Sequence, residues 1–233
     1  IRPDYWPTAG FQVSTPEEQG IDSAMLVEMI ELYQANHAEN PTNSIDSITI
    51  IRNGYVVADL YFNPLYPRDT LHILHSSTKS IMSALLGIAI EPGYIESVDV
   101  PVVELFMDQE LALADERISE VTIKDLLTMQ TGIRSRDSYL YEWNGWFEMM
   151  STDDWVAHFF TLPLDVEPGT RFDYSNMASF MLSAIIHETT GMDTLTYARE
   201  NLFEPLGIEE VYWETSPQGI GIGAARMWLN PHD

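Results

Sequence analysis

The segment HSSTKS, residues 75–80, runs directly into IMSALLGIAI, residues 81–90, an apolar stretch with the composition of a buried helix. Only two of the 233 residues are lysines, and one of them, Lys79, stands at the start of this stretch. If a helix begins here, Ser76 and Lys79 lie three residues apart on one face, whereas Ser77 points elsewhere. The spacing therefore selects Ser76 as the partner of Lys79.

A serine beside a lysine has a specific chemical use. A free serine hydroxyl is a weak nucleophile and needs a neighbouring base to take its proton. A lysine can be that base if burial and nearby positive charge lower its pKa, and a helix N-terminus favours negative charge on the serine oxygen. The pair Ser76 and Lys79 thus predicts an activated serine. A simpler interpretation stays open, because Ser-Ser-Thr before an apolar run is also typical of a helix N-cap.

A second motif lies in RFDYSNMASF, residues 171–180. Tyr174 and Asn176 stand just before an expected helix and after a turn at Pro168-Gly169. Taken singly, Asn176 could cap that helix and Tyr174 could be a packing aromatic. In combination, a Tyr-x-Asn roughly 100 residues after a Ser-x-x-Lys, both at helix starts, could bring a phenol and an amide to the serine.

The N-terminal part predicts a helix and a β-hairpin. An apolar stripe from Met25 to Tyr33 is typical of an amphipathic helix. Residues 47–62, SITIIRNGYVVADLYF, set two β-branched and aromatic runs around Asn53-Gly54, which tolerates positive φ at both centres of a type I′ turn. Two strands are marginal alone, so we expect more sheet than this hairpin.

From Ser80 onward the periodicity is mostly helical. Thr122, with Asp125 three residues on, forms a capping box for a helix that we expect to end at Gly132. Further helices are expected near Thr152 and over residues 177–191. No repeat, low-complexity segment or linker interrupts this region, so it should be one compact helical part beside a sheet.

Composition excludes several classes of function. Eleven Lys and Arg against 36 Asp and Glu give a net charge of −25, a field that would repel a nucleic acid or an anionic membrane surface. The apolar runs fall short of the ~20 residues that cross a bilayer, so no transmembrane segment is expected. The absence of cysteine excludes disulfides, a thiol nucleophile and Cys-ligated zinc.

Together these segments resemble the serine β-lactamase and penicillin-binding-protein-like superfamily. Within it they look most like the class C β-lactamase-like branch of esterases, D-amino-peptidases and amide hydrolases. The boxes are short, but their order and spacing together are specific. The resemblance rests on HSSTKS as a Ser-x-Thr-Lys box, TIKDLLTMQTGI (122–133) as the helix and turn that follow, YSN (174–176) as a Tyr-x-Asn box, and LFEPLGIEEVYW (202–213) and GIGAARMWLNPHD (221–233) as the segments after it.

The resemblance implies a role for each site residue. Ser76 would be the acylated nucleophile and Lys79 its proton partner. Tyr174 would be the general base or proton shuttle that assists acylation and then activates water. Asn176 would hydrogen-bond Lys79 and the substrate amide or ester, and the backbone N–H of Ser76 would form one half of the oxyanion hole. Neither a cofactor nor a metal is implied.

The implied fold is α+β, of the α/β sandwich type, with an antiparallel sheet flanked by helices and a mostly helical domain. Residues 1–75 would form the N-terminal part of the α/β domain, and residues 76–233 the helical domain with both boxes. The family's third box, a Lys- or His-containing triplet ending in Gly, has no counterpart before Asp233. NPHD, residues 230–233, has the composition of a helix start. We therefore expect further strands and a terminal helix, from a C-terminal segment or a second chain that completes the sheet.

Two other patterns have ordinary interpretations. Rigid aromatics in SYLYEWNGWFEMM, residues 138–150, could line an acyl pocket. Tyr139, Trp143, Trp146 and Met150 also fit a helical stripe, so core packing is the favoured interpretation. The six histidines are spread out along the chain and are not expected to bind a metal.

The sequence thus predicts a serine hydrolase that cleaves a carboxylic ester or amide through an acyl-enzyme on Ser76. Its partner would be a small-molecule ester, amide or peptide-like substrate, and the resemblance favours an extracytoplasmic, periplasmic or secreted, location. The alternative is a catalytically inactive relative that serves as a binding or interaction domain. The choice among β-lactam, short ester and D-amino peptide stays open, because surface loops and the strand with the third box set it.

Overall fold

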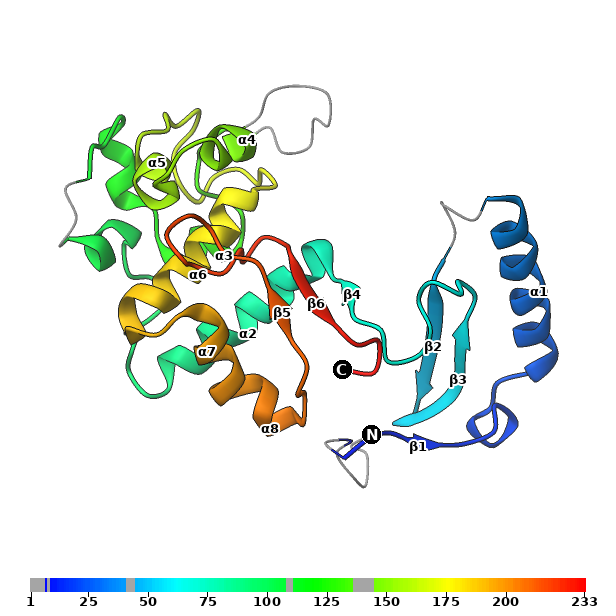
Figure 1. Cartoon of the computed structure of the whole chain (residues 1–233). Coiled ribbons are helices and arrows are strands. Elements are labelled where there is room, and N and C mark those ends of the chain that lie inside the picture. The colour runs from blue at the N-terminus through cyan, green and yellow to red at the C-terminus, as the bar shows by residue number, and fades with distance from the viewer. Residues whose placement is uncertain (1–6, 8, 41–44, 108–110, 136–144) are drawn as a thin grey trace. The chain divides into compact units, whose positions relative to one another are not determined.

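In a computed structural model, which describes residues 7, 9–40, 45–107, 111–135 and 145–233, the chain has the mixed α+β fold expected from its sequence (Figure 1). It divides into two compact units. Unit 1 consists of residues 1–72, 205–210 and 229–233, and unit 2 of residues 73–204 and 211–228. The division into domains after residue 75 stays a prediction.

The long helix of unit 1 is amphipathic, as its sequence predicts. Helix α1, Ser23–Glu39, begins where the Asp22 side chain accepts a hydrogen bond from the N–H of Ala24. Met25, the first residue of the predicted stripe, is 62% exposed, so the stripe begins one residue later than predicted. Its other members, Leu26, Met29, Ile30 and Tyr33, are half-buried, while the residues between them face solvent. The ring of Tyr33 contacts that of Phe62, with centroids 5.7 Å apart. The helix is therefore held by one face.

The predicted hairpin is present in unit 1. Strands β2, Ser47–Arg52, and β3, Tyr55–Tyr61, pair antiparallel, and Asn53 and Gly54 have φ of 53° and 86°, as a type I′ turn requires. The sheet has a third strand that the sequence did not predict: β1, Gln12–Val13, pairs parallel with β3, giving the order β1-β3-β2. A two-residue strand is too short to show an alternating pattern.

Unit 2 is built around one buried helix (Figure 1). Helix α6, Asn176–Thr190, has residues 177–186 buried without exception and ends at Gly191, whose φ is 69°. This confirms the helix predicted over residues 177–191, and Gly191 is its C-cap. The α-helices that contact α6 are α2 (Thr78–Ile90), α3 (Ile123–Leu127), α4 (Gly145–Met150), α5 (Trp155–Phe160) and α7 (Thr194–Ala198), and a 3₁₀ helix, Val102–Phe106, contacts it as well. A π-helix (Arg199–Phe203) and α8 (Glu204–Leu206) continue the chain after α7.

Helix α2 is buried on one face only. Met82, Leu85 and Ala89 lie in the core, whereas Ser83 and Gly87 on the other face are exposed. The apolar composition of residues 81–90 predicted burial all round, and this was wrong. Small residues cover the exposed face, so composition alone does not distinguish it from a core face.

The capping box at Thr122 and Asp125 is confirmed, with both side chains bonded to backbone N–H groups. Helix α3 nevertheless ends at Leu127, earlier than the predicted end at Gly132. The chain leaves the helix at Met129, whose φ is 56°, because tertiary contacts with residues 164–173 hold this segment as a turn.

A second small sheet has the strand order β4-β6-β5. Strand β5, Tyr212–Trp213, pairs antiparallel with β6, Met227–Leu229, and β4 is His72–Ile73. The N–H of Leu74 donates to the carbonyl of Met227 over 2.8 Å. This bond places Met227, the first residue of β6, beside the turn that carries Ser76.

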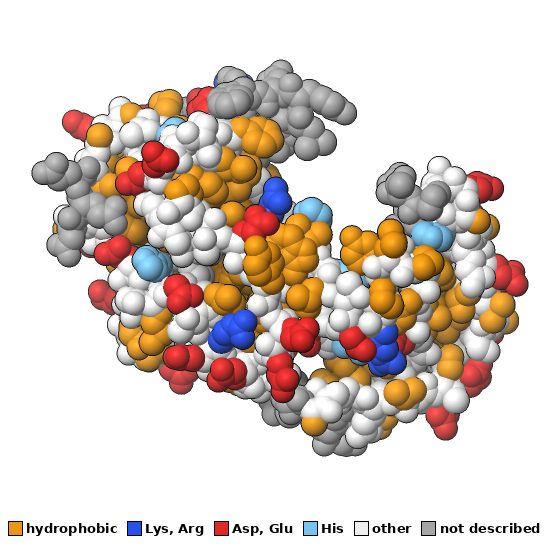
Figure 2. Space-filling model, viewed as in Figure 1, with side chains coloured by type: hydrophobic (Ala, Val, Ile, Leu, Met, Phe, Trp, Pro, Cys, Tyr) orange, Lys and Arg blue, Asp and Glu red, His pale blue; other side chains and the backbone are white. Residues whose placement is uncertain are grey.

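The acidic side chains do not form a single cluster on the face seen in Figure 2. Figure 2 shows Asp and Glu side chains scattered across the visible face rather than gathered in one patch. Within the described parts of the chain, none of the helices combines the length and apolar character needed to cross a membrane.

Candidate active site

The expected nucleophile lies in the turn that opens α2. Ser76 is exposed, in one turn of 3₁₀ helix, His75–Ser77, directly before Thr78. Neither this turn nor α2 has a side-chain cap, so the simpler interpretation of these serines as N-caps is wrong. The Ser76 hydroxyl oxygen instead receives hydrogen bonds from Tyr174 and Lys79.

Lys79 is oriented by three oxygen atoms. Its Nζ lies 3.3 Å from Ser76 Oγ, 2.8 Å from Asn176 Oδ1 and 2.6 Å from the carbonyl oxygen of Ala224. It also lies 5.0 Å from the centroid of the Tyr174 ring, where the negative face of the ring favours a cation. Since these contacts come from three separate segments, the half-buried ammonium group has a defined position next to the serine.

Tyr174 and Asn176 also meet at this point. The Tyr174 hydroxyl donates to Ser76 Oγ over 2.7 Å, and the Asn176 side chain accepts from Lys79. The cap of α6 is Ser175, which accepts from the N–H of Ala178 over 3.1 Å, so the interpretation of Asn176 as N-cap is wrong. All four predicted site residues therefore lie within one hydrogen-bonded group of unit 2.

Tyr174 is held through its backbone. The hydroxyl of Ser135, which is fully buried, donates to the Tyr174 carbonyl and lies 3.0 Å from Asp173 Oδ1. The N–H of Asp173 donates to the carbonyl of Met129 over 2.9 Å. These bonds hold the backbone of Asp173 and Tyr174 just before α6. The held backbone sets the direction in which the Tyr174 phenol points.

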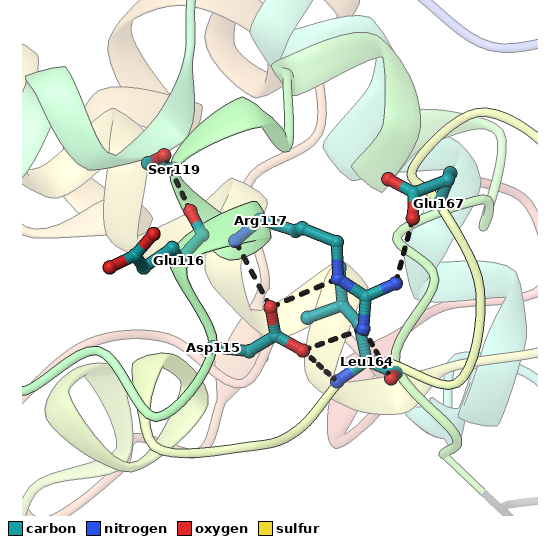
Figure 3. Close-up of polar contacts among 6 residues, drawn as sticks. All are labelled: Asp115, Glu116, Arg117, Ser119, Leu164 and Glu167. Carbon is teal, nitrogen blue, oxygen red and sulfur yellow. Dashed lines mark hydrogen bonds and ion pairs between the residues drawn. The ribbon is translucent and has the colours of Figure 1, made fainter.

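An arginine anchors the segment that leads to Tyr174 (Figure 3). Arg117 donates to both carboxylate oxygens of Asp115, at 2.7 and 3.0 Å, to Glu167 at 2.9 Å and to the carbonyl of Leu164 at 2.8 Å. Hydrogen bonds from Arg117 hold the pKa of Asp115 well below its usual range. The arginine thus ties the turn at 115–120 to the loop at 164–167.

The sequence motifs did not identify the Ala224 carbonyl. A Cβ on the preceding Gly223 would lie 2.6 Å from the carbonyl oxygen of Ser179 and 3.0 Å from Met82 Cγ, so only glycine permits this close approach to α6. The approach brings Ala224 to Lys79. A backbone carbonyl has no side-chain signature, and the similarity of residues 221–233 to a family segment was the one available signal.

A pocket of about 240 Å³ opens beside Ser76. Trp146, Phe147 and Met150 form part of its wall, and Phe147 and Met150 are 44% and 40% exposed. The prediction of core packing for Trp146 and Met150 is therefore wrong for Met150, which is exposed at the pocket, whereas Trp146 both lines the pocket and packs edge-on against Trp155 at 5.4 Å. Tyr139 and Trp143 of the same predicted stripe lie outside the described residues.

The remaining lining comes from the turn of the nucleophile and from the segments around β5 and β6. It includes His75, Asn176, Glu214, Ile222 and Arg226. Among the described residues, no cluster of three or more His, Asp and Glu side chains is placed to hold a metal ion.

The fold and the similarity of the chain to known proteins define its class. The chain shares the architecture of the penicillin-binding-protein and β-lactamase class of hydrolases. The chain belongs to the beta-lactamase family, whose model matches residues 46–233.

Characterised relatives include an unguisins hydrolase of Aspergillus violaceofuscus, 26% identical over 172 residues, which make up 72% of this chain and 30% of that protein. Among solved structures, EstCE1, a hydrolase with promiscuous acyltransferase activity, matches with a TM-score of 0.68 and 17% identity over 88% of this chain and 69% of its own. The D-amino acid amidase of Ochrobactrum anthropi matches with a TM-score of 0.54 and 22% identity over 72% of this chain and 60% of its own. The chain spans about a third of the length of the unguisins hydrolase.

Proposed function

We propose that the protein is a serine hydrolase that cleaves a carboxylic ester or amide through an acyl-enzyme on Ser76. The observation that carries the proposal is the contact of Ser76 Oγ with two proton-transfer groups, the Tyr174 hydroxyl at 2.7 Å and Lys79 Nζ at 3.3 Å. A nucleophile within hydrogen-bond reach of a base, which is itself oriented by further groups, is typical of covalent catalysis.

Acylation requires the Tyr174–Lys79 pair to hold one proton fewer than a phenol beside an ammonium group, so that the pair can accept a proton. Ser76 Oγ then attacks the carbonyl carbon of the substrate, and the hydroxyl proton passes to this pair. The tetrahedral intermediate collapses when the bond to the leaving group breaks, and the same pair returns the proton to the departing alcohol or amine. The acyl group is then an ester of Ser76.

In deacylation, water attacks this ester and gives its proton to the Tyr174–Lys79 pair. The proton goes to Ser76 Oγ as the carboxylic acid departs. Asn176 would contribute by holding Lys79 in place and by hydrogen-bonding the substrate, and the Ser76 N–H by stabilising the oxyanion.

The substrates proposed are small esters, amides or peptide-like molecules, bound in the pocket beside Ser76. The relatives support a hydrolase, since they include an unguisins hydrolase and a D-amino acid amidase. The net charge of −25 opposes a nucleic-acid substrate. An extracytoplasmic location is part of the same proposal, and cell fractionation against a cytoplasmic marker tests it.

The test is covalent labelling with a fluorophosphonate probe, read by intact mass on the complete gene product that contains residues 1–233. Ser76 is expected to form a bond to phosphorus as fluoride leaves with the serine proton, so the protein gains the mass of one probe less HF. Ser76→Ala should abolish the adduct, whereas Ser77→Ala, one residue away, should keep it. If the folded protein gains no adduct and hydrolyses no p-nitrophenyl ester, the alternative of a non-catalytic binding domain is favoured instead.

A further inference from the structure

The carbonyl that contacts Lys79 belongs to a short loop between β5 and β6, residues 221–225 of unit 2. Residues 221–224 of this loop are buried, so their backbone groups need partners inside the protein. The bonds that satisfy these groups also decide where the loop lies. They therefore decide where the Ala224 carbonyl meets Lys79 Nζ, at 2.6 Å.

One of these bonds comes from α7. Thr194, the first residue of that helix, is fully buried, and its hydroxyl oxygen accepts a hydrogen bond from the Gly221 N–H over 3.3 Å. The same oxygen lies 3.1 Å from the buried hydroxyl of Ser183 on α6. A Cβ on Gly221 would lie 3.2 Å from the Cβ of Thr194, so the loop backbone packs directly on this side chain. Thr194 thus joins the start of the loop to α6 and α7.

A second bond comes from the end of β5. The indole N–H of Trp213 donates to the Ile222 carbonyl over 3.0 Å, and Trp213 is only 4% exposed. On the other side of the same residue, the Ile222 N–H donates to the Glu214 carbonyl over 2.9 Å. Gly221 and Ile222 are therefore anchored, and they stand three and two residues before Ala224.

Beyond these anchors the loop has little freedom. The N–H of Ala225 donates to the Ile222 carbonyl over 3.1 Å, which closes a turn around Gly223 and Ala224. Gly223 lies so close to α6 that a Cβ there would be 2.6 Å from the Ser179 carbonyl oxygen. A turn that is anchored at its start and packed at its centre holds the next carbonyl, that of Ala224, in one place.

The position of this carbonyl matters for Ser76. Of the three oxygens that contact Lys79 Nζ, Ser76 Oγ is the farthest, at 3.3 Å, against 2.8 Å for Asn176 Oδ1 and 2.6 Å for the Ala224 carbonyl. A hydrogen bond of this length has little margin, so a small shift of the ammonium group breaks it. Proton transfer requires contact at hydrogen-bond distance. A displaced loop would therefore weaken the contact that activates the serine.

We propose that Thr194 and Trp213 are positioning residues of the active site. Through the loop at residues 221–225 they set the place of the Ala224 carbonyl, and thereby hold Lys79 in contact with Ser76. Neither residue is among those that line the pocket beside Ser76, so both act through the loop rather than on the substrate. This inference rests on the proposed function of Ser76.

The test measures how fast the fluorophosphonate probe labels Ser76 in the complete gene product. The dependence of this rate on probe concentration separates kinact, which reports the reactivity of the serine, from KI, which reports binding of the probe. Thr194→Val keeps the shape of the side chain but removes the acceptor for the Gly221 N–H. We expect it to lower kinact about tenfold and to leave KI within about twofold, since misplacement of a catalytic group by about 1 Å can cost 10²-fold.

Three further variants locate the cause. Thr194→Ser, which keeps the hydroxyl, should recover most of the lost kinact. Trp213→Phe, which removes the indole N–H, should lower kinact in the same way, and it decides the question if Thr194→Val does not fold. Thr189→Val is the matched control, because its hydroxyl bonds the Ile185 carbonyl within α6, and it should keep the kinact of the wild type.

A fourth variant controls for lost stability. Ile118→Val, a core change in the 3₁₀ helix Glu116–Glu120, should lower the melting temperature without lowering kinact.

Each failure has its own signature. If Thr194→Val and Trp213→Phe lose thermal stability but keep the kinact of the wild type, the two residues only support the fold, and this inference is overturned while the proposed function stands. A rise in KI at unchanged kinact overturns it as well, because the loop would then shape the pocket through Ile222 instead of placing Lys79. A folded wild-type protein that the probe does not label at all contradicts the proposed function itself.

Discussion

The hydroxyl of Tyr174 lies 2.7 Å from Oγ of Ser76, although 98 residues separate them in the chain. Each stands at the start of a helix in the same unit, Ser76 before α2, which is buried on one face, and Tyr174 before α6, which is buried along its centre. Because α2 packs on α6, the two helix starts bring a hydroxyl and a phenol together while the helices themselves form the core.

Tyr174→Phe should lower kcat by roughly 10²- to 10⁴-fold, the usual contribution of a positioned acid or base. The ring and its contact with Lys79 remain, so thermal stability should stay close to that of the wild type. Hydrolysis of p-nitrophenyl hexanoate and a melting curve measure the two quantities. Tyr212→Phe, at a tyrosine that is 55% exposed, is the matched control. Full activity of Tyr174→Phe would remove the phenol from the mechanism.

Gly223→Ala should impair both stability and activity. The added methyl would meet the Ser179 carbonyl at 2.6 Å, so the segment must shift, at a cost of about 1–3 kcal/mol, and carry the Ala224 carbonyl away from Lys79. Gly87→Ala is the control, since nothing lies within 4 Å of a Cβ there, and it should stabilise helix α2 by up to about 1 kcal/mol. Denaturant unfolding and ester hydrolysis report both effects. Unchanged kcat in Gly223→Ala would mean that the Ala224 contact is dispensable.

Local sequence signals predicted the local elements. The type I′ turn at Asn53-Gly54, the capping box at Thr122 and the helix end at Gly191 each depend on the conformational preferences of a few adjacent residues. Strand β1 and the early end of α3 depend on partners far along the chain, which periodicity does not record.

The site likewise combines residues that local motifs predict with contacts between distant parts of the chain that they do not. Ser-x-x-Lys and Tyr-x-Asn are visible as short motifs, and their spacing led to the four residues that the structure brings together. The Ala224 carbonyl and the position of Arg226 were not predicted, because a backbone contact and a pocket wall arise only when β5 and β6 pair beside the nucleophile. Core packing was wrongly predicted for the side of α4 that faces the pocket. A stripe of apolar residues at helical spacing looks the same in the sequence whether it packs in the core or lines a cleft.

Ser135→Ala should affect catalysis through the position of Tyr174. The change removes a buried hydrogen bond to the Tyr174 carbonyl and should destabilise the fold by about 1–3 kcal/mol. Since Ser135 does not line the pocket, kcat should fall more than KM rises.

Ser135→Thr, which keeps the hydroxyl, should recover part of the lost kcat. Ser151→Ala removes only a solvent-exposed hydrogen bond, to the Glu148 carbonyl, and should leave kcat close to that of the wild type. Steady-state kinetics with one ester probe compares these variants. A loss of stability in Ser135→Ala with wild-type kcat would show that Ser135 supports the fold but does not position Tyr174.

The Arg117 cluster should make stability depend on pH in the acid range (Figure 3). Hydrogen bonds from the Arg117 side chain and backbone lower the pKa of Asp115 in the folded protein. A carboxyl group whose folded pKa is below its unfolded value of about 3.9 stabilises the fold above that pH, and the contribution is lost as the pH falls toward the folded pKa. Asp115→Asn should therefore lower Tm at pH 7, and its difference from the wild type should shrink as the pH falls below about 4.

Thermal melts by circular dichroism between about pH 7 and pH 2 measure this difference. Glu116→Gln changes a carboxylate in the same turn but outside the Arg117 cluster, so its Tm difference from the wild type should be small at neutral pH. A Tm difference for Asp115→Asn that stays constant over the whole range would show that the residue acts through packing or uncharged hydrogen bonds. An increase in Tm at pH 7 would contradict the stabilising role of the cluster, because it would mean that desolvation of the carboxylate outweighs its bonds to Arg117.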